Sequence, residues 1–236
     1  MNILFNSDAL GFGIKSSFKG TGGTAPYAYS VVPGGVGGQI DSSGLYTAGN
    51  KVGKDTIKVS DDDGKVAYKE VFVGTAQHLL CDIIQKELGL AQGRVYIFDQ
   101  KLFMPTDEGL FIAVSVLSCK PFGNQNKYNG ALDKQEQSAN FYASMQLDII
   151  SRGTDALFRK EEVVMALKSD YAERQQELNN FLIGSLPSAF TNLSQIDGSA
   201  IPYRFSITLG LQYQVRKISP TSYFDEFEDV QIETDP

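Results

Sequence analysis

Segment 151–157 brings an arginine, a glycine, a threonine and an aspartate into one short stretch, and two glutamates follow it. These residue types could do chemistry, because Arg152 could hold an anion while Asp155, Glu161 or Glu162 acted as a general acid or base. Glu161 and Glu162 are adjacent, however, so on a helix their side chains diverge by about 100° and cannot work as a pair. The segment therefore lacks the geometry of a two-carboxylate active site.

The same segment also fits a purely structural interpretation. Gly153 permits a tight turn, and Thr154 or Asp155 is of a type that caps the helix expected to follow. Arg159 and Lys160 precede the two glutamates, which is typical of a solvated helix face with local ion pairing. We favour this interpretation, in which the charged turn meets a neighbouring subunit rather than a substrate.

The remaining reactive residue types are few. The chain has one histidine, His78, which is too few for most metal sites and for most Cys–His catalytic sites. We expect a capping or packing role for this residue. Cys81 and Cys119 could form a disulfide, but their wide spacing and apolar surroundings favour two buried, reduced thiols. We therefore expect a protein that is not an enzyme and that holds neither a cofactor nor a metal.

The net charge of −7 over 236 residues is unevenly distributed. Residues 1–75 carry as many basic as acidic residues, whereas residues 221–236 contain no basic residue. The acidic residues of this tail are Asp225, Glu226, Glu228, Asp229, Glu233 and Asp235. DNA binding needs clustered Lys and Arg, so specific DNA binding is not expected.

Two further classes of protein are disfavoured by the hydropathy pattern. No apolar run approaches the ~18–20 residues of a membrane-spanning helix. The start of the chain lacks the basic and apolar regions of a secretory signal. The expectation is a soluble protein made in a cytoplasm.

The first third of the chain is rich in Gly, Thr, Ser and Val and contains short runs with strand character between turn signals. In one run, Ile57 and Val59 alternate with polar residues, as in a strand with one buried face. The aspartates of "DDDGKV", residues 61–66, could suggest a calcium loop, but the later ligands of an EF-hand are missing. We predict instead a hairpin turn in which Asp63 and Gly64 both adopt positive φ.

Three blocks of this region carry a specific resemblance. They are, in chain order, "GGTAPYAYSV", "GGQIDSSGLYTAG" and "GKDTIKVSDDDGK". Together they resemble the bacterial immunoglobulin-like repeat family of surface and phage structural proteins. The resemblance implies a β-sandwich of about seven short strands over residues 1–75 and a role in adhesion, spacing or decoration.

From residue 76 onward the sequence pattern changes to helices and longer strands. Helices are expected over residues 76–90 and 155–168, which have apolar residues at helical spacing. Two strands longer than the usual five or six residues are expected over residues 141–149 and 203–215. Residues 120–139 are polar, and they form either an extended hairpin or a partner-binding loop.

The predicted fold class combines these parts. It is an N-terminal all-β immunoglobulin-like sandwich, residues 1–75, followed by an α+β domain, residues 76–220. The second domain has a mixed or antiparallel sheet with helices on one face, in the order α-β-β-β-α-β-β. An acidic C-terminal tail, residues 221–236, completes the chain.

The second part also resembles a known family. A strand that ends in "DIISRG", the segment "YAERQQE", a short "IG" strand, "NLS" and the long strand that begins "YRF" occur in order over about residues 79–215. This order resembles the tail terminator, or tail completion, proteins of tailed bacteriophages. The matching positions are Asp148, Ser151, Arg152, Gly153, Tyr171, Gln175, Gln176, Glu177, Gly184, Pro187, Asn192, Ser194, Tyr203, Arg204 and Phe205.

The resemblance implies a structural virion protein that is assembled in the host cytoplasm. Such proteins form a ring, usually of six subunits, that ends the tail tube and joins it to the connector proteins of the neck. DNA passes through the lumen without specific binding, which a neutral to acidic wall would favour. We expect the contacts within the ring in segment 120–139, in the Arg152 turn and in the tail. The candidate interface residues are Arg152, Asp155, Tyr128, Asn129, Asp225, Glu226, Glu228 and Asp229.

An alternative from another class stays open at this point. The chain could be a surface adhesion or decoration protein whose immunoglobulin-like domain binds a cell-wall glycan of the host. In that case the second part would serve only as an anchor.

Overall fold

The computed structural model of the chain describes residues 2–5, 11–13, 15–98, 105–129, 134–184, 189–194 and 203–220. The regular structure is mostly β, with a few helices. Strands of the first part are β1 (Asn2–Phe5), β2 (Lys15–Thr21), β3 (Ala28–Val31), β4 (Gln39–Ile40), β5 (Leu45–Thr47), β6 (Gly53–Ser60) and β7 (Val66–Val73). In the second part the first elements are α1 (Ala76–Glu87), β8 (Val95–Ile97), β9 (Phe111–Asn129) and β10 (Lys134–Ser151). They are followed by α2 (Asp155–Ala166), α3 (Asp170–Asn179), β11 (Phe181–Ile183), β12 (Thr191–Asn192) and β13 (Tyr203–Pro220).

The first part consists of two small antiparallel sheets, with strand orders β1-β2-β5-β4 and β3-β6-β7. They share a hydrophobic core whose buried members are Phe18, Tyr46, Ala48, Ile57, Val59, Val71 and Val73. The rings of Phe18 and Tyr46 meet edge to face with centroids 5.8 Å apart. Ile57 and Val59 are fully buried, so the alternation expected in this strand is confirmed.

The hairpin predicted at "DDDGKV" joins β6 to β7, whose ladder runs from Gly53 opposite Val73 to Ser60 opposite Val66. The predicted turn type is wrong, because Gly64 has φ +78° but Asp63 has no positive φ. The carboxylate of Asp61 accepts hydrogen bonds from the backbone N–H groups of Thr24 and Lys65. This carboxylate therefore holds the turn in place.

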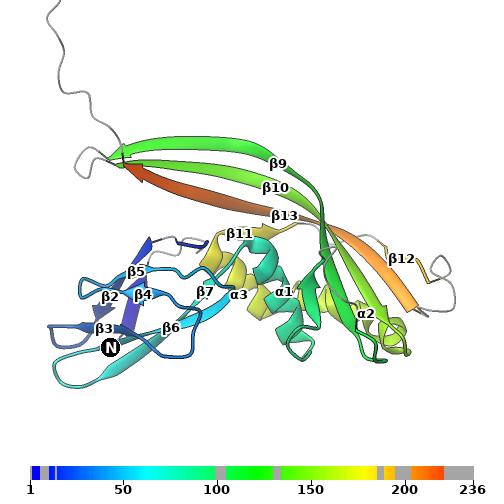
Figure 1. Ribbon diagram of the computed structural model, residues 1–236, viewed down its shortest axis with the longest axis horizontal. Coiled ribbons are helices and arrows are strands. Elements are labelled where there is room, and N and C mark those ends of the chain that lie inside the picture. Colours follow the sequence, from blue (N-terminus) through cyan, green and yellow to red (C-terminus); the bar gives the residue numbers. More distant parts are fainter. Residues whose placement is uncertain are drawn as a thin grey trace, which may run out of the picture.

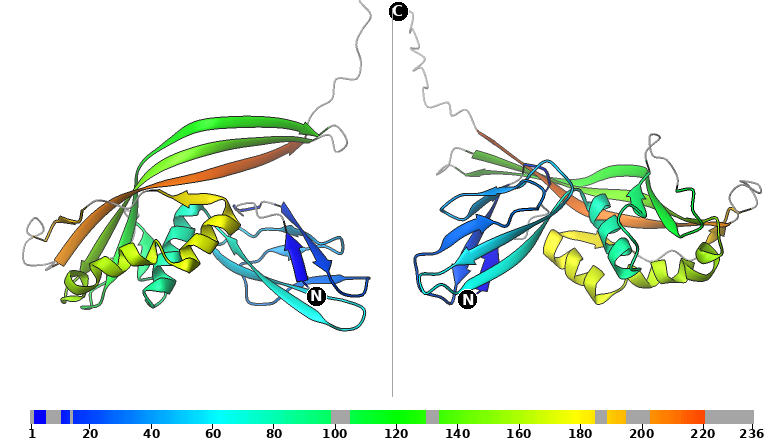
Figure 2. Two further views of the ribbon diagram at one scale, coloured as in Figure 1. Left: turned by 180° about the vertical axis from the view of Figure 1, so that it is seen from behind. Right: turned by 60° about the horizontal axis from the view of Figure 1, so that its bottom comes forward.

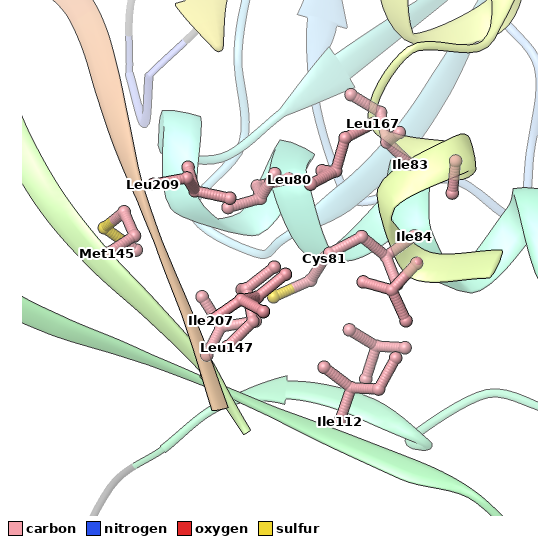
Figure 3. Packing of buried hydrophobic residues seen from close by; sticks show 14 of the residues in the cluster. Leu80, Cys81, Ile83, Ile84, Ile112, Met145, Leu147, Leu167, Ile207 and Leu209 are labelled. Carbon is pink, nitrogen blue, oxygen red and sulfur yellow. The ribbon is translucent and has the colours of Figure 1, made fainter. Parts of the chain in front are cut away.

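The second part is built on a six-stranded sheet with the order β11-β13-β10-β9-β8, and β12 pairs with β13. Strand β8 pairs with β9 in parallel, and the other pairs are antiparallel. Figure 1 shows α1, α2 and α3 on one face of this sheet. In Figure 3, Cys81 of α1 lies against Leu147 of β10 and Ile207 of β13, so apolar residues of the helices and the strands form one continuous core.

Helix α1 begins after Thr75 and buries Leu79, Leu80, Cys81, Ile83 and Ile84. The expected role of His78 in capping is confirmed, because its Nδ1 lies 3.4 Å from the backbone N of Thr75 and 2.7 Å from the Oγ1 of Thr75. Gly89 follows the helix with φ +63°, a conformation that favours glycine.

The predicted element order lacked one helix, α3, and one short strand, β12. The helix expected over residues 155–168 corresponds to α2, which ends at Ala166, and a separate helix, α3, begins at Asp170. Ser169 is the reason for the break, because its backbone is extended and its side chain accepts a hydrogen bond from the backbone N–H of Ala172. Within the described parts of the chain, no helix has the length and apolar character needed to cross a membrane.

Segment 120–139 belongs to a long hairpin, which confirms one of the two expectations for it. Strand β9 continues to Asn129 and β10 starts at Lys134, which lies opposite Asn129. Strand β13 pairs with the whole length of β10, from Ser151 opposite Tyr203 to Lys134 opposite Pro220. Figures 1 and 2 show this three-stranded part of the sheet extending well past the helices.

Candidate interaction site

The most unusual feature of the chain is the part of the sheet that has no helical layer beneath it. We call residues 115–129 of β9, 134–142 of β10 and 212–220 of β13 the outer ribbon. The buried positions of these strands end at Val114, Ala143 and Leu211. Beyond them the described side chains are exposed or only partly buried.

Both edges of the outer ribbon are open among the residues that the structure describes. Strand β8 pairs with β9 only between Ile112 and Val114, so residues 115–129 have no strand on that side. Strand β11 pairs with β13 only as far as Tyr213, which leaves residues 214–220 without a neighbour on their outer side. An open edge presents unpaired N–H and C=O groups and can accept a strand from another chain.

Two β-bulges on β9 place large apolar side chains in solvent. The register shifts around Met145 and Phe141 leave Leu117 and Phe122 without a direct partner on β10. Leu117 is 54% exposed and Phe122 is 57% exposed. Bulges are often used to redirect a side chain, and here the two bulged residues are both apolar. The sequence carries little signal for them beyond Pro121, which cannot donate a ladder hydrogen bond.

A shallow hollow of about 440 Å³ lies beside Phe122, between the outer ribbon and the end of α3. Leu182 of β11, which is 52% exposed, also lines it. Several of the other lining groups are side-chain amides, and three of them, Asn140, Gln176 and Gln214, form hydrogen bonds with another amide or with the backbone. Gln214, for example, donates from Nε2 to the Oδ1 of Asn140 over 3.1 Å. The hollow therefore offers apolar contact and a pre-ordered polar rim.

The base of the outer ribbon is tied to the rest of the molecule through Tyr213. Its ring stacks on Phe141 with centroids 5.8 Å apart, and its hydroxyl accepts a hydrogen bond from Nε2 of Gln77 in α1 over 3.2 Å. Burial, followed by the hydrogen bond with Cys119, raises the pKa of the Tyr213 hydroxyl. These contacts give the ribbon a fixed direction relative to α1.

Both cysteines are free thiols, but only one is buried as expected. Cys81 is 8% exposed, and burial raises the pKa of its thiol to about 12. Cys119 is exposed, because it lies on β9 beyond the end of the helical layer. The prediction of two buried thiols is therefore wrong for Cys119.

The Arg152 turn is held by a buried serine, Ser151, whereas Thr154 or Asp155 was predicted to cap the helix. Ser151 is fully buried, and its Oγ accepts a hydrogen bond from the backbone N–H of Ala156 and donates one to the carbonyl of Gly153. Thr154 occupies the N-cap position of α2, but its side chain makes no capping hydrogen bond. Thr154 was a candidate because a threonine directly before a helix often caps it. In the structure, the Oγ of Ser151, three residues earlier, accepts the hydrogen bond from the first turn of α2.

The two glutamates of α2 do not converge on a common point. Glu161 pairs with Lys160 at 2.8 Å, and the hydrogen bond from Lys160 lowers the pKa of Glu161. Glu162 pairs with Arg159, also at 2.8 Å. The ion pairs expected for a solvated helix face are confirmed, and no paired acid–base site forms at this turn.

A second apolar surface lies on α2. Phe158 and Met165 are each 72% exposed, and their spacing of seven residues places them on the same face of the helix. We call this pair the α2 patch. Figures 1 and 2 show α2 at the end of the molecule opposite the tip of the outer ribbon.

The expected interface residues fall into three groups. Tyr128 is 51% exposed on the outer ribbon, and Asn129 ends β9 beside it. Arg152 is exposed in the turn before α2, and Asp155 is the first residue of that helix. Strand β10 separates these two groups by its 18 residues, or about 60 Å at ~3.3 Å per residue. The expected acidic contacts Asp225, Glu226, Glu228 and Asp229 lie outside the described residues.

Within the described parts of the chain, no group of three or more His, Cys, Asp or Glu side chains could hold a metal ion. The chain matches no protein-family model and no curated protein.

Proposed function

We propose that the chain is a structural virion protein of a tailed bacteriophage that forms a ring at the end of the tail tube. The observation that supports this most strongly is the outer ribbon, a stiff extension with open edges and exposed Leu117 and Phe122. Exposed apolar side chains on an open strand edge are a liability for a monomer and are suited to contact with another chain.

The positions of the two apolar surfaces favour a ring over a two-fold dimer. A two-fold dimer uses the same patch on both subunits, whereas a ring joins two different patches head to tail. The outer ribbon and the α2 patch differ in structure and lie at opposite ends of the molecule (Figure 1). In the proposed ring, the outer ribbon of one subunit packs on the α2 patch of the next, beside its Arg152 turn.

The energies of these contacts are consistent with a stable ring. Full burial of an exposed Leu or Phe side chain contributes about 1.5–3 kcal/mol. Leu117 is 54% and Phe122 57% exposed, so covering what remains exposed of the two contributes about 1.5–3.5 kcal/mol to each interface. Association costs at least about 4 kcal/mol, so these two residues alone do not hold a dimer. Closure of a ring gives every subunit two such interfaces, and burial of Phe158 and Met165, each 72% exposed, adds to each of them.

The rest of the proposal follows the sequence resemblances. The ring ends the tail tube and joins it to the connector proteins of the neck, six copies are expected, and DNA passes through the lumen without specific binding. Residues 1–75 form an immunoglobulin-like sandwich that projects outward, which is supported by two antiparallel sheets around a shared core. The acidic segment 221–236 contributes a further contact between subunits. The protein is assembled in the host cytoplasm and resides in the virion.

A pair of charge substitutions tests this function. Light scattering after size exclusion would compare the unmodified chain with the double variant Leu117→Lys, Phe122→Lys. A matched control is Val52→Lys, Tyr68→Lys, which also replaces two exposed apolar residues but lies in the first part. We expect the unmodified chain and the control to form the same closed oligomer and the ribbon variant to be monomeric.

The opposite pattern would overturn the proposal. If the ribbon variant retained the oligomer, the ribbon would not be the interface. If the unmodified chain were monomeric and were retained on cell-wall material through its first part, the adhesion function would replace the ring.

A further inference from the structure

A compact polar cluster joins the two parts of the molecule. Lys54 of β6 forms an ion pair with Asp82 of α1, with Nζ and Oδ2 3.0 Å apart. The hydroxyl of Tyr171 in α3 donates to the same Oδ2 over 3.1 Å. Lys86 of α1 lies over the Tyr171 ring, with Nζ 3.6 Å from its centroid. Burial alone would lower the pKa of Lys54, but the hydrogen bond and charge of Asp82, with help from Tyr171, raise it.

A cleft of about 270 Å³ opens beside this cluster, between the sheet of β6 and β7 and the helices α1 and α3. Residues of β7 and of α3 line it, and Figure 1 shows the end of β7 near α3. Four of its lining residues are basic and one is acidic. The lining residues are Lys54, Lys69, Glu70, Val71, Phe72, Lys86, Tyr171, Arg174, Gln175, Leu178 and Asn179.

The cleft is a basic site on a chain whose net charge is −7. Lys54 is paired with Asp82, and even without counting Lys54 and Lys69 the lining carries Lys86 and Arg174 against one acidic residue, Glu70. Low-dielectric walls strengthen the field of such a group of charges. The cleft therefore favours an anionic occupant.

The wall of the cleft also has an apolar component. Val71 is buried, while Phe72 and Leu178 are partly buried and contribute to the lining. The best occupant thus combines several negative charges with apolar side chains, as an acidic peptide with aromatic residues would.

One segment of this chain has that composition. Residues 221–236 contain six acidic residues and no basic one, and Phe224 and Phe227 are interleaved with Asp225, Glu226 and Glu228. We propose that the acidic segment 221–236 of one copy docks in the basic cleft of a neighbouring copy. The inference rests on the proposed ring and assigns the surface that receives this segment.

The register of the outer ribbon argues for a neighbouring copy rather than the same one. Phe181, two residues after the end of α3, pairs with Tyr213, and β13 then runs on for seven residues to Pro220. At ~3.3 Å per residue, these seven residues place Pro220 about 23 Å along the strand from Tyr213, which lies beside the end of α3 and therefore near the cleft of the same copy. Asp225 lies five residues beyond Pro220, and a chain of that length spans at most about 18 Å, so Phe224 and Asp225 cannot return to the cleft of their own copy. Residues from Phe227 onward have about 25 Å of chain or more and can reach it, so only a neighbouring copy can accept the segment as a whole. In the proposed ring, by contrast, the outer ribbon of one copy lies on α2 of the next, which is followed directly by α3.

Zero-length carbodiimide cross-linking of the full chain tests the inference. This reagent joins a lysine to a carboxylate only where the two are in contact, and the Lys54–Asp82 pair at 3.0 Å is an internal positive control. An equal mixture of ¹⁴N- and ¹⁵N-labelled chains would be cross-linked and digested, and the peptides analysed by mass spectrometry. We expect products between segment 221–236 and Lys69 or Lys86, half of them with mixed isotopes.

Two variants test whether the basic residues of the cleft are responsible for the docking. The triple substitution Lys69→Gln, Lys86→Gln, Arg174→Gln is expected to reduce the assembly constant at low salt at least tenfold and to abolish these products. The control Lys15→Gln, Lys19→Gln removes two exposed lysines of β2 and should leave both unchanged.

Each other outcome would overturn the inference. Cross-links of the tail that carry one isotope only would place the segment in its own cleft, and tail products at lysines outside the cleft would show that it docks elsewhere. The absence of tail products, while Lys54–Asp82 forms and native mass spectrometry shows the oligomer, would refute the docking but leave the ring. Absence of the oligomer itself would instead refute the proposed function.

Discussion

The carboxylate of Asp55 allows a quantitative test of how the first part is held together. Asp55 is fully buried on β6 and accepts three hydrogen bonds, from the backbone N–H groups of Val36 and Gly38 and from the hydroxyl of Tyr46. These bonds are 2.7, 2.9 and 2.5 Å long. They fix the loop before β4 and the central tyrosine of the core to the same strand.

Substitution Asp55→Ala removes all three acceptors. A hydrogen bond to a charged group contributes about 1.5–3 kcal/mol, and a buried donor left without a partner costs a similar amount. Val36 and Gly38 are only partly buried, so water can offset part of the loss at their amides, whereas the Tyr46 hydroxyl has no such access. We expect a loss of about 3–6 kcal/mol, a large fraction of the stability of a small domain.

Asp41→Ala is a matched control. Asp41 also accepts three hydrogen bonds, two from Ser43 and one from the backbone of Leu45, but it is exposed, and water can replace them. Hydrogen exchange by mass spectrometry, read on peptides from residues 15–73, would give the local stability of each variant. If Asp55→Ala lost no more protection than Asp41→Ala, the claim that burial of this carboxylate organises the first part would be wrong.

Three further predictions concern the second part. In the native chain, Cys119 is expected to react with a thiol reagent at pH 8 while Cys81, whose pKa is raised to about 12 by burial, reacts only on unfolding, as peptide mass spectrometry would show. Burial lowers the pKa of His78, so its contribution to stability is present above the unfolded value of about 6.5 and is lost as the pH falls toward the folded value. His78 is the one histidine, so urea melts of His78→Gln should show a weaker loss of stability between about pH 7 and 5.5 than the unmodified chain. Arg204→Ala should destabilise the chain by about 3 kcal/mol in the same melts, because it leaves the 93% buried carboxylate of Asp148 without its ion-pair partner, and a change near zero would contradict this.

Much of the fold could be predicted from local patterns. The alternation around Ile57 and Val59 identified a strand with one buried face, and the apolar stripe of residues 76–90 identified α1. The long alternating strands were predicted for the same reason, since a period of two over many residues leaves few alternatives. These elements are determined by side chains that lie close together in the sequence.

The features that were missed depend on other kinds of information. The break between α2 and α3 is set by one serine, Ser169, in a segment that otherwise keeps helical spacing. Cys119 is exposed because the helices do not extend far enough to cover this part of β9. The alternation of apolar residues in a strand does not indicate where the helices that cover it end. The bulges at Leu117 and Phe122 arise from a register between two strands, and no local residue pattern specifies them.

The candidate site was predicted only in part. Tyr128 lies on the outer ribbon and Arg152 precedes α2, but nothing in the sequence indicated that the two lie at opposite ends of the molecule. The apolar residues Phe158 and Met165 were not singled out, because an apolar position on a helix is normally buried. Their exposure became evident only when the helix was placed on the sheet.

Native mass spectrometry of the full chain tests the central claim most directly. The proposed ring predicts a closed oligomer of one defined size, with six copies expected, and its loss in the Leu117→Lys, Phe122→Lys variant. A monomer at every concentration, or an open series of sizes that never closes, would contradict the ring.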